Sequence, residues 1–128
     1  MVREPEGWRV FLDWASGVRI HFATQVAKGL DVTAAFDRTE VLTPRGETVQ
    51  LRLLVRNHST APVQLKAVHR VEPTAIEQQL DLVQCGYLFP RIVEQEGVDE
   101  SPLVYFVDGE LPKDVTQLNV TLEFRRVE

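Results

Sequence analysis

Cysteine and methionine are nearly absent from this sequence, which has one of each, Cys85 and Met1. A single cysteine cannot form an intrachain disulfide, and it cannot supply a thiolate zinc site from one chain. A length of 128 residues suits one domain whose core needs no disulfides. We therefore expect a single domain over residues 1–128, in which any disulfide would be intermolecular.

Basic residues are in deficit, because 14 Lys and Arg face 19 Asp and Glu, and no basic run occurs. Proteins that bind nucleic acid cluster Lys and Arg along the phosphates, so we expect no nucleic-acid partner. No apolar stretch reaches the roughly 18 residues that span a bilayer. The chain as given is therefore expected to be soluble, either by itself or as a domain cut from an anchored parent.

Apolar and polar residues alternate along much of the chain with a period of two. Leu118–Arg125 alternates strictly, so its apolar side chains share one face, as in a half-buried strand. The same pattern predicts strands at 18–22, 50–53 and 63–67.

Two connections predict which strands pair. Residues 8–14 also alternate, and the short link at 15–17 predicts a hairpin with the strand at 18–22. Asn57–Pro62 has turn composition, so the strands on either side of it are predicted to form an antiparallel pair.

A sustained 3.6-residue period is missing, and only residues 74–83 could contain a short helical turn. Seven or eight short strands separated by turns are typical of a sandwich rather than of alternating βαβ units. The predicted fold is all-β, an immunoglobulin-like antiparallel β-sandwich.

The common enzyme motifs are also missing. The sequence has no Gly-x-Ser-x-Gly elbow, phosphate loop, His-Glu-x-x-His or dinucleotide fingerprint, so we expect no enzyme. The three histidines, His21, His58 and His69, do not have the spacing of metal ligands on one helix or hairpin. We expect His21 and His58 to be solvated, and His69 to be a buried, hydrogen-bonded residue of its strand.

Two features admit both a structural and a functional interpretation. The acidic stretch at 94–100 lacks the ligand spacing of a calcium loop and is expected to be a solvated connection. Cys85 follows the strand-like run at 80–84 and precedes Gly86 and Tyr87. Composition alone favours Cys85 as a small buried apolar residue.

A series of short segments, rather than one motif, carries a family resemblance. The segments are Val18–Phe22 with Val26–Leu30, Thr43–Thr48, Leu54–Asn57 with Ala61–Val63, Ala67–Pro73, Gln84–Cys85, Ser101–Asp108 and Leu118–Phe124. In this order, and over about Val18 to Phe124, they resemble the soluble domain of the CtaG-type cytochrome c oxidase assembly family, copper chaperones for the copper B centre of the oxidase.

Three of these segments resemble named stretches of that family. Ala67–Pro73 is similar to its Ala-x-Tyr-Asn-Val-x-Pro segment, and Ser101–Asp108 to its Met-Pro-Val-x-Phe-x-Val-Asp-Pro segment. Gln84–Cys85 stands where the family has Gln-Cys-Phe-Cys-Phe.

The resemblance implies an immunoglobulin-like domain on the periplasmic side of the inner membrane, tethered by a transmembrane helix that this chain does not contain. It also implies that Cys85 binds copper(I) for delivery to the copper B centre. The implied partner is a cytochrome c oxidase subunit I-like protein.

The implied copper site departs from the family pattern of Cys-x-Cys, because Tyr87 occupies the second position. Residues 8–14 occupy the region of a further family cysteine. Copper(I) is soft and prefers thiolates, whereas a phenol with a pKa near 10 is a hard and mostly protonated ligand. Two interpretations stay open: a homodimer that joins two Cys85 thiolates on one copper, and a metal-free immunoglobulin-like interaction module that has lost the site.

Overall fold

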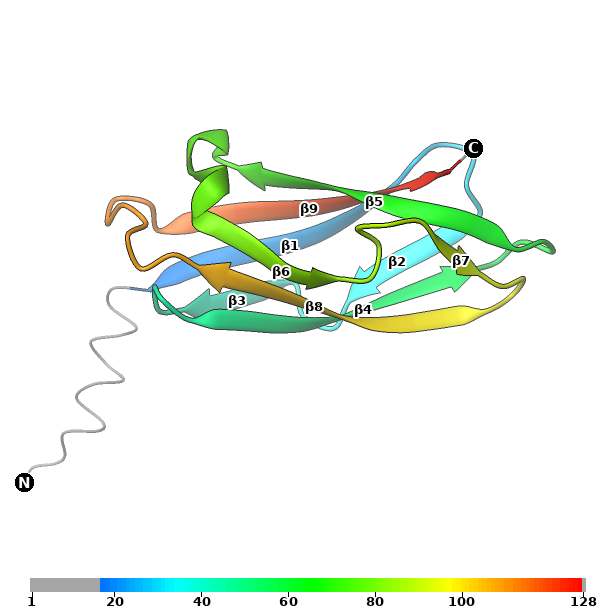
Figure 1. The fold of residues 1–128 in the computed structure, drawn as a ribbon, viewed down its shortest axis with the longest axis horizontal. Helices are drawn as coiled ribbons and strands as arrows, with labels where there is room; N and C mark the ends of the chain where they lie inside the picture. The colour runs from blue at the N-terminus through cyan, green and yellow to red at the C-terminus, as the bar shows by residue number, and fades with distance from the viewer. Residues whose placement is uncertain (1–16, 128) are drawn as a thin grey trace, which may run out of the picture.

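A computed structural model describes residues 17–127 and shows a β-sandwich (Figure 1). Its strands are β1 (Val18–Val26), β2 (Val32–Phe36), β3 (Glu40–Thr43), β4 (Thr48–Asn57), β5 (Val63–Glu72), β6 (Leu80–Cys85), β7 (Arg91–Val93), β8 (Val98–Val107) and β9 (Gln117–Arg126). A 3₁₀ helix, η1 (Thr74–Gln79), joins β5 to β6 and confirms the predicted helical turn. The strand predicted at 8–14, with its hairpin, lies outside the described residues.

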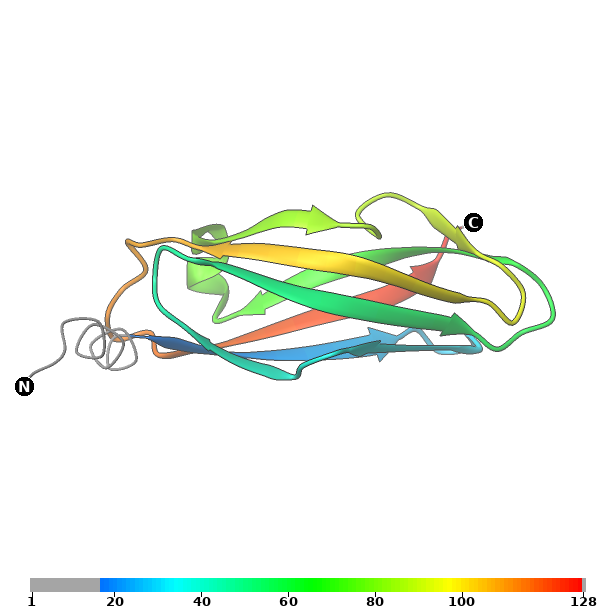
Figure 2. The ribbon, with the colours of Figure 1, turned by 90° about the horizontal axis from the view of Figure 1, so that it is seen from below.

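The strands form two sheets, one in the order β3-β1-β9-β5-β7 and the other in the order β2-β4-β8-β6. Neighbours are antiparallel except β1 and β9, which run parallel. Figure 2 shows β4 and β8 side by side along the length of the molecule. The all-β sandwich is confirmed, with nine strands in the described part of the chain where we expected seven or eight.

The core lies between the sheets because the long strands bury every second side chain. In β4 the buried apolar residues are Val49, Leu51, Leu53 and Val55, and in β9 the apolar face predicted from the alternation is fully buried. The polar side chains between them face water, so the period of two fixes the register of each strand.

The antiparallel pair predicted across Asn57–Pro62 is wrong, since β4 and β5 belong to different sheets. The buried Asn57 directs the crossing. Its Nδ2 donates to the carbonyl oxygens of Ala61, Val93 and Glu94 at 2.9, 3.0 and 3.1 Å, and its Oδ1 accepts the backbone N–H of Ser59 at 2.9 Å. Turn composition predicts that the chain changes direction, but it does not show which strands then pair.

One edge of the sandwich is left open between β5 and β6. The outer strand β7 pairs with β5 only at Val63–Leu65, and β6 is the outer strand of the other sheet. Since η1 carries the chain from one sheet to the other, the later part of β5 faces β6 without strand pairing between them. This edge contains the sequence-predicted site.

Candidate functional site

Cys85 is the last residue of β6, and a β-bulge turns its side chain inward. Leu82 pairs with Tyr105 and Gln84 with Val104, so Val83 is an extra residue without a partner. Strict alternation from Leu82 would point Cys85 outward, but the extra residue reverses the parity and sets Cys85 opposite the buried Leu103. The thiol therefore faces the interior of the sandwich.

Cys85 is nevertheless partly exposed. It packs against two clusters of buried core residues, one that contains Tyr105 and one that contains Tyr87. The prediction from composition that Cys85 is a small buried residue is therefore only partly correct. Burial raises the pKa of the Cys85 thiol, against smaller opposing effects of hydrogen bonds to the backbone of Tyr87 and Leu88. At neutral pH the sulfur carries its proton, and a metal ion that binds there must displace it.

Tyr87 is fully buried, and its hydroxyl is committed to Asp99. The hydroxyl donates to Asp99 Oδ2 at 2.6 Å, while Arg91 Nη2 donates to Asp99 Oδ1 at 2.8 Å. The Arg91 guanidinium also lies 5.6 Å from the centre of the Tyr87 ring. Burial and the Asp99 carboxylate raise the pKa of Tyr87, so the phenol stays protonated and is not free to act as a ligand.

His69 and Tyr105 lie in contact across the interior. His69 belongs to β5 and Tyr105 to β8, and their rings stack with centres 5.2 Å apart and planes at 27°. His69 faces inward as expected, but the expected hydrogen bond is wrong for its Nε2, which is buried without a partner. The fully buried hydroxyl of Tyr105 has no partner either. Burial lowers the pKa of His69, against an opposing effect of Glu77, so its ring is neutral near pH 7.

The other two histidines lie at the surface, as expected. His21 Nδ1 is 3.6 Å from Glu40 Oε1, and the exposed His58 places Nε2 2.9 Å from Thr33 Oγ1. Within residues 17–127, no group of three or more His, Cys, Asp or Glu side chains is arranged to hold a metal ion.

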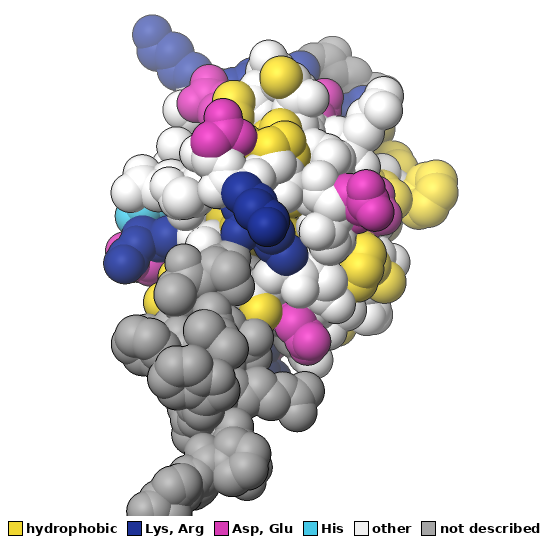
Figure 3. Space-filling model, turned by 90° about the vertical axis from the view of Figure 1, so that its left-hand side faces the viewer, with side chains coloured by type: hydrophobic (Ala, Val, Ile, Leu, Met, Phe, Trp, Pro, Cys, Tyr) yellow, Lys and Arg dark blue, Asp and Glu magenta, His cyan; other side chains and the backbone are white. Residues whose placement is uncertain are grey.

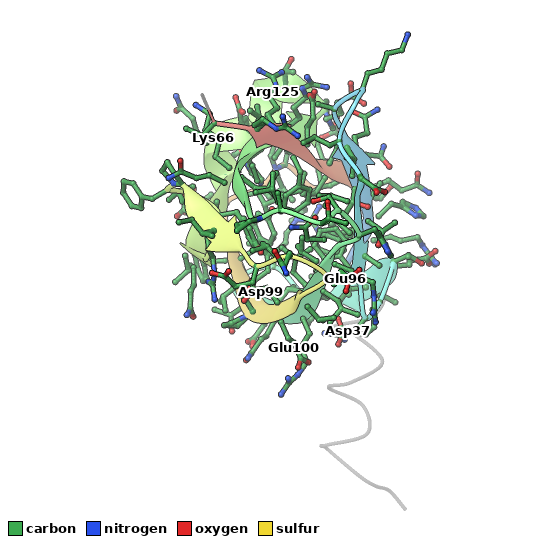
Figure 4. The ribbon with its side chains drawn as sticks, turned by 90° about the vertical axis from the view of Figure 1, so that its right-hand side faces the viewer. Asp37, Lys66, Glu96, Asp99, Glu100 and Arg125 are labelled. Carbon is green, nitrogen blue, oxygen red and sulfur yellow. The ribbon has the colours of Figure 1, made fainter. Side chains whose placement is uncertain are left out.

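The acidic stretch holds more structure than the solvated connection that we expected. Glu96 lies in the turn after β7, whereas Asp99 and Glu100 belong to β8. Figure 4 shows these three side chains on one side of this end of the sandwich, with Lys66 and Arg125 on the other. Sequence reasoning missed the bonds of Asp99 to Tyr87 and Arg91, because no local pattern announces contacts that form across a loop.

Exposed apolar side chains occur on both sides of Cys85 in the sequence. Val83, Leu88, Phe89 and Ile92 are 60%, 52%, 77% and 58% exposed, and all four lie in β6, β7 or the loop between them. We call these four residues the apolar rim. The apolar pair Leu88–Phe89 in a loop was a signal available in the sequence, since such residues are usually buried.

The end face seen in Figure 3 has a different character. Lys and Arg side chains are interspersed there with Asp and Glu and with scattered hydrophobic groups. Among the described residues, none of the helices is long and apolar enough to cross a membrane.

Comparisons with known proteins identify the family of this chain. The family described as cytochrome c oxidase assembly protein CtaG/Cox11 matches residues 4–126. The chain is 34% identical over 99 residues to the cytochrome c oxidase assembly protein CtaG of Sinorhizobium medicae, covering 77% of this chain and 50% of that protein. It is 30% identical over 98 residues to the protein of the same name from Rhizobium meliloti, again covering 77% of this chain and 50% of the relative.

The chain therefore belongs to the CtaG/Cox11 family, which confirms the resemblance found in its segments. It spans about half the length of the relatives that it matches.

Proposed function

We propose that this domain takes part in cytochrome c oxidase assembly by binding copper(I) through Cys85 and delivering it to the copper B centre of the oxidase. The observation that carries the proposal is the thiol itself, which is partly exposed at an open sheet edge of a CtaG/Cox11 fold. A thiolate is the side-chain ligand that copper(I) prefers. Binding and release need no chemical turnover, so the domain acts as a carrier and not as an enzyme.

The apolar rim supplies the docking surface in this proposal. A carrier must bring its metal ligand close to the acceptor, and the four exposed apolar side chains of β6, β7 and the loop that follows Cys85 favour such a contact. The proposed partner is a cytochrome c oxidase subunit I-like protein. A homodimer that joins two Cys85 thiolates would use the same surface.

The proposed location is the periplasmic side of the inner membrane. The relatives are about twice as long as the matched region, which leaves room in them for a membrane anchor. In this proposal the parent protein has a transmembrane helix outside the sequence described here.

A metal-free interaction module is the second candidate function, and Tyr87 favours it. In the family pattern this position belongs to the second cysteine of the pair, but here a phenol fills it and donates to Asp99. Loss of a linked second ligand lowers affinity on the order of 10²- to 10⁴-fold. The apolar rim would then bind a protein partner without carrying metal.

An anaerobic copper(I) titration against a coloured chelator separates the two candidates. We expect tight binding by the unmodified protein and its loss in Cys85→Ser, with the oligomeric state followed in parallel. Binding no tighter than that of Cys85→Ser would contradict the copper proposal and support the metal-free module.

Docking is tested separately with rim and control variants. Phe89→Ser removes the most exposed side chain of the apolar rim, and Leu54→Ser removes an exposed apolar residue of β4, which is 42% exposed. We expect Phe89→Ser to slow copper transfer to an oxidase that lacks copper at its B centre, and Leu54→Ser to leave it unchanged. Equal rates in both variants would contradict docking through the rim.

A further inference from the structure

His69, on β5, and Cys85, at the end of β6, lie at the same open edge of the sandwich. The strand β5 runs antiparallel to β7, with Leu65 opposite Arg91, and the Ala67 N–H donates to the Tyr87 carbonyl oxygen at 2.9 Å. Residues further along β5 therefore lie opposite earlier residues of the segment between β6 and β7. The next inward-facing residue of β5 after Ala67 is His69, and the chain that faces it leads back from Tyr87 to Cys85.

Tyr105 ties the two side chains to one place. The Tyr105 ring stacks on the ring of His69. Tyr105 is also paired with Leu82 of β6, which lies just before the bulge that turns Cys85 inward. Cys85 is paired with Leu103, two residues before Tyr105 on the same face of β8, so Cys85 and Tyr105 are diagonal neighbours on the inner face of that sheet.

Two of the three polar groups at this edge have no hydrogen-bond partner. The hydroxyl of the fully buried Tyr105 and the buried Nε2 of His69 make no hydrogen bond, although more than nine in ten buried polar groups in proteins do. The third group, the Cys85 thiol, makes its described hydrogen bonds only with backbone. A site that leaves a nitrogen lone pair and a hydroxyl unpaired next to a thiol is suited to receive a cation.

We propose that His69 Nε2 is the second copper(I) ligand, so that one chain holds the metal between His69 and Cys85, with the Tyr105 hydroxyl against the sulfur. This inference rests on the proposed function, since it completes the same copper site. It removes the need for a second thiolate from another chain. Imidazole nitrogen and thiolate sulfur both suit copper, and a two-coordinate arrangement requires only these two atoms.

The binding step balances without a redox partner. Copper stays in the +1 state, the Cys85 thiol releases one proton to solvent, and the neutral His69 ring releases none. The ring hydrogen must then be on Nδ1, which leaves the Nε2 lone pair for the metal. Tyr105 acts as a positioning residue, because its ring fixes the plane of the imidazole and its hydroxyl can donate to the sulfur.

Copper(I) itself is the probe for the test, in the same anaerobic titration with His69→Gln and His69→Phe added. If His69→Gln does not fold, His69→Phe serves in its place, because phenylalanine keeps a ring against Tyr105. We expect one copper per monomer, one proton released per copper, and affinity lower on the order of 10²-fold in both variants. The matched control is His58→Gln, which removes a surface histidine and should bind as the unmodified protein does.

Copper X-ray absorption on the loaded, unmodified protein tests the ligands without any substitution. One sulfur and one nitrogen neighbour are expected. One copper per two chains with two sulfur neighbours, two protons released per copper, and no effect of His69→Gln or His69→Phe would overturn this inference while the carrier function survives. No binding above that of Cys85→Ser would overturn both.

Discussion

Two buried tyrosines of this domain differ in one respect, the partner of the hydroxyl. Both Tyr87 and Tyr105 are fully buried, and burial raises the pKa of each. The Tyr87 hydroxyl donates to Asp99, whereas the Tyr105 hydroxyl has no partner. A paired buried hydroxyl stabilises the fold, while an unpaired one costs stability. The comparison separates Tyr87, whose hydroxyl stabilises the fold, from Tyr105, which belongs to the proposed copper site.

The largest expected effect extends this comparison to Asn57, the buried amide with the most partners. Asn57→Ala leaves the carbonyl oxygens of Ala61, Val93 and Glu94 without their donor, so we expect a loss of about 3 kcal/mol in the free energy of unfolding. Urea unfolding without copper measures it. The exposed Asn119 on β9 provides the control, since Asn119→Ala should cost less than about 0.5 kcal/mol. Equal losses in the two variants would show that the buried amide network does not hold the crossing.

A smaller loss is expected for Tyr87→Phe. The ring and its contact with Phe124 remain, but the hydrogen bond to the Asp99 carboxylate is lost, and Arg91 alone then pairs with it. Hydrogen bonds to charged groups contribute about 1.5–3 kcal/mol, so we expect a loss of about 2 kcal/mol in urea unfolding. A change below about 0.5 kcal/mol would place Tyr87 in the same class as Tyr105.

The smallest effect on stability is expected for Tyr105→Phe. This variant removes an unpaired hydroxyl from the core, so the free energy of unfolding should stay the same within about 0.5 kcal/mol or increase. The same urea titration compares it directly with Tyr87→Phe. A loss as large as that of Tyr87→Phe would mean that the Tyr105 hydroxyl has a partner in the folded protein, and the comparison would fail.

The sequence predicted the fold well where the structure of a strand depends only on the residues of that strand. The period of two located β1, β4, β5 and β9 and their buried faces, because alternation depends only on which side chains face the core. It failed at Asn57–Pro62, where the partner of β4 is chosen by contacts with residues 36 and 37 positions further on, Val93 and Glu94. Local composition does not contain that information.

The candidate site was predicted in part for the same reason. Cys85 was identified from a resemblance and His69 as an inward-facing residue from alternation, but nothing local related one to the other. Their place at the same edge of the sandwich follows from the bulge at Val83 and from the way η1 leads β5 over to β6. Phe89 was visible in the sequence as an apolar loop residue, yet its exposure depends on the open edge.

The unpaired Val83 determines which face of the sheet the Cys85 side chain lies on. Deleting this one residue would restore uninterrupted alternation in β6 and turn the sulfur from the interior to the outer face, without changing any residue of the proposed copper site. In the proposed copper site, the type of the side chain and the direction in which it points are therefore set by separate features, the first by the cysteine at position 85 and the second by the bulge before it.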